Sequence, residues 1–344
     1  MATVIEYRRA HWILRTMLAV AVLVAGCGAW VAYQDTYEIR EEHVTITGGK
    51  QPLKGVLAWP TAGKGPYGLV VFVHGDGPAD ATHKDFYLPL WETFAQAGYA
   101  SLSWNKPGVG GAAGNWLDQS MADRAAETVA AITWAKGRPG LDANRIGLWG
   151  GSQAGWVMPK VAIRLPELRF VIALSPAVNW QQQGHYYLQR KLQDEHATPD
   201  RVQAELARQE MMLERLRAGA PYEHYKAAVG DTRGMTAKRW TFISKNYTSD
   251  AASDLAAMRV PVLLLLAGHD RNVDVADTEA GYRKHLRAPG MLQVRHYPDA
   301  THDLIRKDLK DSELKMFLFA VAAPRSLFSD GFLHDQRDYL EKVS

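Results

Sequence analysis

The stretch Asn144–Met158 reads NRIGLWGGSQAGWVM, and it decides the fold that the rest of the chain is expected to adopt. Its apolar beginning, residues 146–149, is typical of a buried strand in a parallel sheet. Ser152 follows between small residues, and an apolar segment with helical potential comes next. This pattern predicts a nucleophile elbow, a strained strand-to-helix turn in which small neighbours let two backbones come close. The serine would stand at a helix N-terminus, where free N–H groups favour developing negative charge.

Ala154 is a departure from the usual pattern of such a turn, G-x-S-x-G, which has glycine two residues after the serine. Alanine is nearly as small as glycine, so we expect the turn to form. The alternative interpretation of this stretch is a glycine-rich βα turn without a catalytic role.

The composition is that of an ordinary globular protein. The 344 residues suffice for one large α/β domain or two small ones, and 47% hydrophobic with 22% charged residues argue against wholesale disorder. The net charge of +3 gives no sign of the clustered basic face that binds nucleic acid. A single cysteine, Cys27, excludes cysteine-rich zinc sites.

The N-terminus carries the features of an export signal. Three arginines lie within residues 8–15, and the apolar run Met17–Ala25 follows. The end of that run, Leu23–Cys27 (LVAGC), resembles a bacterial lipobox, which implies cleavage before Cys27 and lipid attachment to its sulfur.

An uncleaved anchor is the competing interpretation of residues 1–33. Thr16–Tyr33 contains 18 residues without a charge, just enough to span a bilayer. Arginines before it and acidic residues after it would place the bulk of the protein outside the cytoplasm. Lipoprotein and anchor both predict a membrane-tethered, extracytoplasmic protein, whereas a buried core helix is a third possibility.

The remaining chain, residues 34–344, alternates apolar strands and helices after an antiparallel start. Expected strands are 43–47, 53–59, 68–73, 99–104, 146–149, 170–174, 260–267 and 291–297, and expected helices include 86–97, 120–136, 275–286 and 312–322. Residues 179–258 interrupt this pattern with a polar, charged and aromatic composition, and Thr198-Pro199 begins a helix there. The pattern predicts an α/β fold with a mostly parallel sheet, helices on both faces and a helical lid insertion.

Four polar residues fall just after apolar strands, where open α/β sheets bind their ligands. They are Asp76, Ser152, Asp270 and His302. A serine nucleophile needs a base that is itself oriented by a carboxylate, and the expected chain order is Ser, acid, His. We therefore expect Asp270 as the acid and His302 as the base. An Asp270 that only caps the next helix is an alternative, although Asp274 is better placed for that.

His302 is preferred as the base because it lies in the loop after the last strand, whereas His296 lies within that strand. A surface histidine without a role is the alternative. His269 is the second candidate, but its side chain should point away from the neighbouring Asp270.

An oxyanion hole requires two backbone N–H groups near the nucleophile. Gln153, immediately after Ser152, should supply one of them. The loop His74-Gly75-Asp76-Gly77-Pro78 should supply the other, from Asp76 or, failing that, from Gly77. We expect His74 to be a structural hydrogen-bonding residue and not a second base.

The motifs GGSQAG, HGDGP, NKPGVGG, GHDRNV and DATH together resemble the α/β-hydrolase superfamily, most closely its bacterial serine esterase and S9-peptidase-like branches. The resemblance covers roughly residues 43–325 apart from 179–258, and it implies Ser152, Asp270 and His302 as the triad. Besides Ala154, the chain has Asn105-Lys106 where many relatives carry Asp-Arg, which puts a structural salt bridge in doubt.

The insertion 179–258 stands where lids enter this fold. Its aromatic residues are candidates either to line an acyl or aryl pocket or to pack the lid onto the body. They are Trp180, Tyr186, Tyr187, Tyr222, Tyr225, Trp240, Phe242 and Tyr247.

These residues predict a serine hydrolase that cleaves carboxylic esters of small molecules through an acyl-enzyme, without a metal or cofactor. An S9-like peptidase or an acyl-thioesterase would use the same triad. Because no β-propeller is evident that would restrict access to peptides, ester cleavage is the preferred expectation. A catalytically inactive binding protein on the same fold is the alternative from another class.

Overall fold

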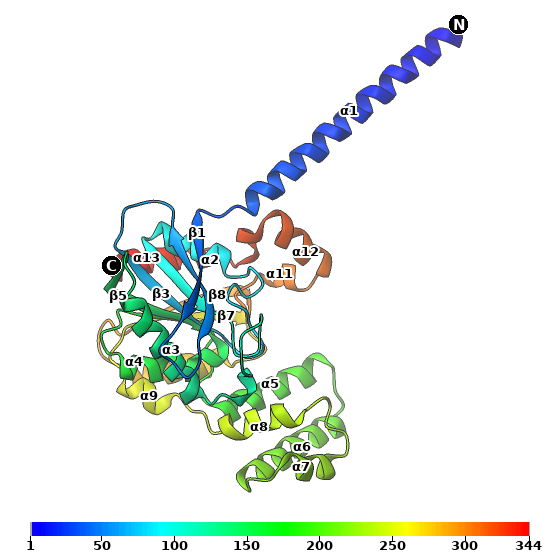
Figure 1. Cartoon of the computed structure of the whole chain (residues 1–344). Coiled ribbons are helices and arrows are strands. Elements are labelled where there is room, and N and C mark those ends of the chain that lie inside the picture. Colours follow the sequence, from blue (N-terminus) through cyan, green and yellow to red (C-terminus); the bar gives the residue numbers. More distant parts are fainter. Residues whose placement is uncertain (1, 344) are drawn as a thin grey trace.

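The computed structural model describes residues 2–343, and its centre is an eight-stranded sheet in the order β1-β2-β4-β3-β5-β6-β7-β8 (Figure 1). The strands are β1 Ile39–Ile46, β2 Leu53–Pro60, β3 Tyr67–Val73, β4 Tyr99–Trp104, β5 Leu141–Gly151, β6 Val171–Leu174, β7 Val262–His269 and β8 Leu292–Thr301. The β1–β2 and β2–β4 pairs are antiparallel, and the other pairs are parallel. The expected α/β-hydrolase architecture is confirmed.

Alternation along the central strands divides the core into two layers. On β3, Leu69, Val71 and Val73 face one layer, whereas Val70 and Phe72 face the other. The first layer contains buried side chains of α3 (Met121–Lys136), α4 (Met158–Arg164), α9 (Ala252–Ala257) and α10 (Val275–His285). The second contains those of α2 (Leu88–Gln96) and α13 (Phe332–Val343). Both faces of the sheet are therefore covered, and its strands read as continuous apolar runs.

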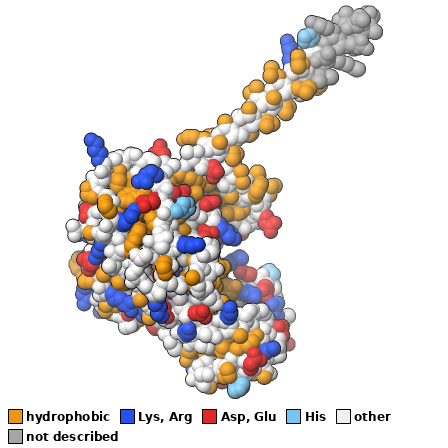
Figure 2. Space-filling model, viewed as in Figure 1, with side chains coloured by type: hydrophobic (Ala, Val, Ile, Leu, Met, Phe, Trp, Pro, Cys, Tyr) orange, Lys and Arg blue, Asp and Glu red, His pale blue; other side chains and the backbone are white. Residues whose placement is uncertain are grey.

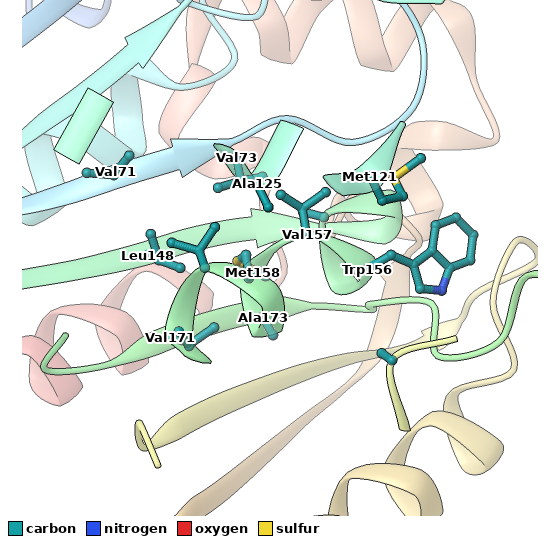
Figure 3. Close-up of a cluster of buried hydrophobic side chains, with 14 of the residues drawn as sticks. Val71, Val73, Met121, Ala125, Leu148, Trp156, Val157, Met158, Val171 and Ala173 are labelled. Carbon is teal, nitrogen blue, oxygen red and sulfur yellow. The ribbon is translucent and has the colours of Figure 1, made fainter. Parts of the chain in front are cut away.

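Figure 3 shows the first layer around the start of α4, where Val157 and Met158 pack among side chains of β3, β5 and α3. Both residues are completely buried. At roughly 25 cal/mol per Å² of apolar surface, each buried side chain of this size contributes about 2 kcal/mol, as an upper estimate. This packing fixes the position of the chain immediately after Ser152.

Helix termini follow the expected capping chemistry. Ser120 and Asp123 form a reciprocal capping box at the start of α3. Thr198 caps α6 (Pro199–Arg217), and Asp274 caps α10 through the N–H groups of Ala276 and Asp277. Asp274 thus has the capping role that we considered as an alternative for Asp270.

The C-terminal region differs from the expectation. Residues 312–322 should close the fold, but the helix formed there, α12 (Glu313–Ala322), has no buried residue. The closing helix is α13, which buries Phe332, Gln336, Tyr339 and Leu340. Only four of its twelve residues are buried, and one of those is polar, so no continuous apolar run marks this helix in the sequence.

Residues 179–258, the expected insertion, form helices between β6 and β7. They are α5 Trp180–Asp194, α6 Pro199–Arg217, α7 Tyr222–Val229, α8 Ala237–Asn246 and α9 Ala252–Ala257. Figure 1 shows α6 and α7 at the end of the molecule farthest from the N-terminus.

The N-terminal helix α1 (Ala2–Gln34) projects from the body (Figure 1). Its segment Leu14–Gln34 is long and apolar enough to cross a membrane, and 0% of that window is buried. A buried core helix, the third possibility for this segment, is therefore wrong. Cys27 lies within α1 and is exposed.

Candidate active site

Ser152 occupies a strained turn at the carboxyl end of β5. The strand ends at Gly151, a 3₁₀ turn covers Ser152–Trp156, and α4 follows. Ser152 has φ +55°, in the left-handed region that non-glycine residues seldom adopt. Backbone strain of this kind concentrates at functional sites, where the surrounding packing maintains it.

Small neighbours make this turn possible, and they also account for Ala154. A Cβ atom on Gly150 would lie 2.5 Å from the Val73 carbonyl oxygen and 2.7 Å from the Cβ of Ala154. A Cβ on Gly155 would lie 2.6 Å from the Ala177 carbonyl oxygen. Ala154 is completely buried, with its methyl group directly against Gly150. The position accepts alanine because Gly150 leaves the space for it.

His302 and Asp270 form a hydrogen bond of 2.7 Å between Nδ1 and Oδ2. The Asp270 side chain is fully buried, and its other oxygen accepts hydrogen bonds from the N–H groups of Asn272 and Val273 at 2.8 and 2.9 Å. Burial lowers the pKa of His302, but the hydrogen bond and negative charge of Asp270 outweigh it, so that the pKa lies above its ordinary value. The carboxylate is thus fixed by backbone donors and orients the imidazole.

Ser152 and His302 line one cavity of about 260 Å³ at the carboxyl ends of the strands. Its lining residues are Gly75, Asp76, His83, Phe86, Tyr87, Trp149, Gly151, Ser152, Leu174, Asn272, His302 and Asp303. His269, the second candidate base, is exposed and does not line this cavity.

The loop after β3 lies against Ser152. A Cβ on Gly75 would be 3.7 Å from the Cβ of Ser152. His74 is held in a structural role, since its Nδ1 pairs with the Tyr87 hydroxyl at 2.9 Å and its Nε2 with the Trp104 carbonyl at 2.6 Å. Burial, followed by the nearby Lys106 charge, keeps the pKa of His74 well below its ordinary value, so the ring is neutral.

Two buried basic side chains, Lys106 and Arg124, donate hydrogen bonds to the carbonyls of this loop. Lys106 Nζ donates to the carbonyls of Gly75 and Gly77 at 2.6 and 2.8 Å. Arg124 donates to the carbonyl of His74, and to Gln153 Oε1 at 2.5 Å. These hydrogen bonds hold the loop in place through its carbonyl groups. The Asn105-Lys106 sequence put a structural salt bridge in doubt, and Lys106 instead donates hydrogen bonds to the two glycine carbonyls.

Arg239 of α8 supports the same loop from the insertion. Its two terminal nitrogens donate to Oδ1 and Oδ2 of Asp76 at 3.0 and 2.6 Å. Gln153 Nε2 also donates to Asp76 Oδ1, at 3.0 Å. Burial raises the pKa of Asp76, but Arg239 outweighs it and the net shift is downward. Asp76 and Gln153, the two expected oxyanion residues, are therefore linked by their side chains.

The insertion touches the acid side of the site as well. Tyr186 donates its hydroxyl to the Asp270 carbonyl at 3.0 Å, and Gln183 Nε2 donates to the Asn272 carbonyl at 2.8 Å. Sequence reasoning missed these contacts and that of Arg239, because each joins positions far apart in the chain. The one hint in the sequence was the number of aromatic residues in the insertion, and of these residues only Tyr186 makes such a contact.

Most of the other insertion aromatics make packing contacts, within the insertion or, for Phe242, edge-to-face on Trp116 of the body at 5.4 Å, whereas Tyr187 is exposed. Tyr225 stacks on Trp240 at 4.5 Å, and Trp240 Nε1 donates to the Ala220 carbonyl. None of the eight candidate aromatics lines the 260 Å³ cavity, whose aromatic side chains, His83, Phe86, Tyr87 and Trp149, come from the body. Of the two roles considered for these residues, packing is the one that the contacts support.

A family model described as serine aminopeptidase S33 matches residues 64–309. No curated protein sequence matches the chain significantly. Among solved structures, an esterase from Pyrococcus furiosus superposes with a TM-score of 0.53 at 14% identity over 89% of each chain. An acylaminoacyl peptidase from Pyrococcus horikoshii gives 0.53 at 12% identity over 90% of this chain and 42% of that one. A 2,6-dihydroxy-pseudo-oxynicotine hydrolase gives 0.53 at 15% identity over 89% and 68%.

At these identities the solved structures establish the fold, in which esterases and S9-type peptidases are both found, and the family match covers most of the chain. The chain therefore belongs to the serine aminopeptidase S33 family and is a serine hydrolase of the α/β-hydrolase type.

Proposed function

We propose that this protein hydrolyses carboxylic esters through an acyl-enzyme, with Ser152 as nucleophile, His302 as base and Asp270 as the orienting acid. The observation that carries the proposal is that Ser152, on its strained turn, and His302, hydrogen-bonded to the buried Asp270, line one cavity. Acyl transfer requires a nucleophile and a base that is oriented by a carboxylate, and these positions support that assignment.

In the proposed reaction, Ser152 Oγ attacks the ester carbonyl while His302 Nε2 takes the hydroxyl proton. Asp270 holds Nδ1–H and stabilises the imidazolium. The N–H groups of Gln153 and Asp76 bind the oxyanion, and collapse of the intermediate expels the alcohol, which receives the proton from His302. Water, deprotonated by His302, then attacks the acyl-enzyme, releases the carboxylic acid and restores Ser152.

The charge of the cavity favours an ester over a substrate with a free amino terminus. An aminopeptidase needs an anionic group for the substrate ammonium, and the carboxylates that line the cavity beside His302 are Asp76 and Asp303. Asp76 is paired with Arg239, and Asp303 with Lys310 at 3.0 Å. Phe86, Trp149 and Leu174 supply an apolar wall suited to a small acyl group.

Labelling with a fluorophosphonate probe tests the chemistry. Wild type should label and Ser152→Ala should not. If wild type fails to label, a catalytically inactive binding protein is the better interpretation. A panel of p-nitrophenyl esters of rising chain length, aminoacyl amides and acyl-CoA thioesters then separates the substrate classes. Faster turnover of the amides or thioesters than of every ester would overturn the ester assignment.

We also propose that α1 tethers the enzyme to a membrane on the extracytoplasmic side, as an uncleaved anchor or as a lipoprotein modified at Cys27. The support is the exposed apolar segment Leu14–Gln34 with arginines before it. The two forms are separated by globomycin treatment alongside Cys27→Ser. Unchanged size and membrane retention indicate the anchor, whereas accumulation of an unprocessed precursor indicates lipidation.

A further inference from the structure

The surface helix α12 carries an apolar stripe that the rest of the body leaves exposed. Leu314, Phe317, Leu318 and Val321 follow the i, i+3, i+4, i+7 spacing of one helix face and are between 42% and 68% exposed. Outside α1, the described residues contain only two other exposed large apolar side chains, Ile163 and Tyr187. The exposed apolar surface of the body is therefore concentrated on α12.

This stripe is continuous with the membrane-compatible helix. Trp30 Nε1 of α1 donates to the carbonyl of Ala322, the last residue of α12, at 2.7 Å. Figure 2 shows apolar side chains along α1 and on the adjoining surface that Figure 1 assigns to α12. Both charged residues of α12, Glu313 and Lys315, lie in its first turn, so the half that meets α1 is uncharged.

The position of Trp30 gives the depth of α12 relative to a bilayer. Tryptophan and tyrosine concentrate at the boundary between lipid and water, and Trp30 and Tyr33 are the exposed aromatic residues at the body end of the Leu14–Gln34 segment. A helix attached at Trp30 therefore lies at the level of the lipid headgroups, where amphipathic helices bury their apolar face in a bilayer.

The junction between α1 and the body is held by several contacts. Arg325, just after α12, donates to the carbonyls of Gln34 and Thr36, each at 2.8 Å, and pairs with Glu92 of α2 at 2.6 Å. These bonds set the direction in which α1 leaves the body. The orientation of α12 relative to the α1 axis follows from them.

We infer that α12 is a second membrane contact, with Leu314, Phe317, Leu318 and Val321 immersed in the lipid surface. The inference rests on the proposed tether through α1. It is argued for the uncleaved anchor, in which the whole segment Leu14–Gln34 is retained. Contact at two points holds the body in one orientation and places the loop that follows His302, which leads through residues 303–312 to α12, close to the membrane.

A single fluorophore on full-length protein in nanodiscs tests this inference. In a Cys27→Ser background, which leaves no other cysteine, an NBD label is placed by Leu318→Cys, by Leu23→Cys within α1, or by Glu223→Cys on the exposed surface of α7. Lipids with brominated acyl chains then report which labels touch the bilayer. We expect blue-shifted emission and at least twofold quenching at positions 318 and 23, and no quenching at 223.

The three positions separate the possible failures. Quenching at 23 but not at 318 would overturn the role of α12 and leave the tether standing. Absence of quenching at both would overturn the tether and the inference together. Fluorophosphonate labelling of Ser152 in each sample reports the catalytic proposal independently, and it also shows that each variant is folded.

Discussion

The carboxyl edge of the sheet and the helical insertion hold their side chains in different ways. Ser152, Asp270 and His302 each follow a parallel strand, and backbone geometry positions them: a strained φ of +55° for Ser152 and two N–H donors for Asp270. The insertion contacts the same site through the ends of two long side chains, Arg239 at Asp76 and Tyr186 at the carbonyl of Asp270. The edge contains the three residues that we propose as the catalytic triad, and the insertion contacts the loops next to them.

This difference predicts a gradient of mutational effects. Changes at the strand ends should remove the chemistry, whereas changes at the insertion contacts should weaken it without abolishing it. Arg239 contacts Asp76 and Tyr186 contacts the carbonyl of Asp270, so their effects can also show which of the two contacts matters more for activity.

The largest effect is expected for Ser152→Ala. Loss of the nucleophile should lower kcat for a p-nitrophenyl ester by about 10⁶-fold, since one missing triad member costs nearly as much as all three in a well-studied serine protease. Residual rate would come from oxyanion stabilisation alone. A loss below about 100-fold, with unchanged circular dichroism, would mean that another group attacks the ester.

Asp270→Asn should be the second most severe change, with a loss of about 10⁴-fold in kcat/KM at neutral pH. The pH profile gives a separate readout. In wild type the activity should fall on the acid side through a His302 pKa above its ordinary 6.5, because the base must be neutral to accept a proton. Asp270→Asn removes the hydrogen bond to a carboxylate and the negative charge that raise the His302 pKa, while burial still lowers it, so the acid limb of the residual activity should move to lower pH.

The His302–Asp270 pair also makes the stability of the protein depend on pH. The raised pKa means that the folded state favours the protonated imidazole, so the stabilisation is fully present below the unfolded pKa of about 6.5 and is lost as pH rises through the higher folded value. Chemical denaturation of wild type and Asp270→Asn across this range should show their difference in unfolding free energy shrinking as pH rises. A difference that grows with pH would contradict the assignment.

Much of this edge could be predicted from the sequence because apolar runs mark buried strands, and the residue after each run must lie at the edge of the sheet. Ser152, Asp270 and His302 were located in that way. Arg239 could not be located from the sequence, because its partner Asp76 lies 163 positions away in the chain. The helix that carries Arg239 also contains lysines, and such a helix is equally typical of a solvent-exposed surface. Lys106 was visible only as a departure from a motif, and its two carbonyl partners required coordinates.

Arg239→Gln should have an intermediate effect. Without the guanidinium, the Asp76 carboxylate keeps only Gln153 and its local backbone partner, so the loop that offers the Asp76 N–H should become less ordered. We expect kcat to fall by about 10-fold with KM nearly unchanged, because an oxyanion contact acts mainly in the transition state. Arg217→Gln, which removes the exposed pair with Glu210 in the same insertion, is the control and should change neither constant. An effect confined to KM would indicate a substrate-binding role instead.

The smallest effect is expected for Tyr186→Phe, which removes one hydrogen bond to the Asp270 carbonyl. A neutral hydrogen bond contributes about 0.5–1.5 kcal/mol, equivalent to a loss of roughly 2- to 10-fold in kcat/KM if all of it acts on the position of Asp270. Tyr187→Phe is the matched control, since that neighbouring side chain is largely exposed. Because the carboxylate keeps its bonds to Asn272 and Val273, the His302 pKa should stay the same in the pH profile of Tyr186→Phe. A shift of the acid limb would show that α5 also influences the pKa of His302 and does not only hold the Asp270 loop in position.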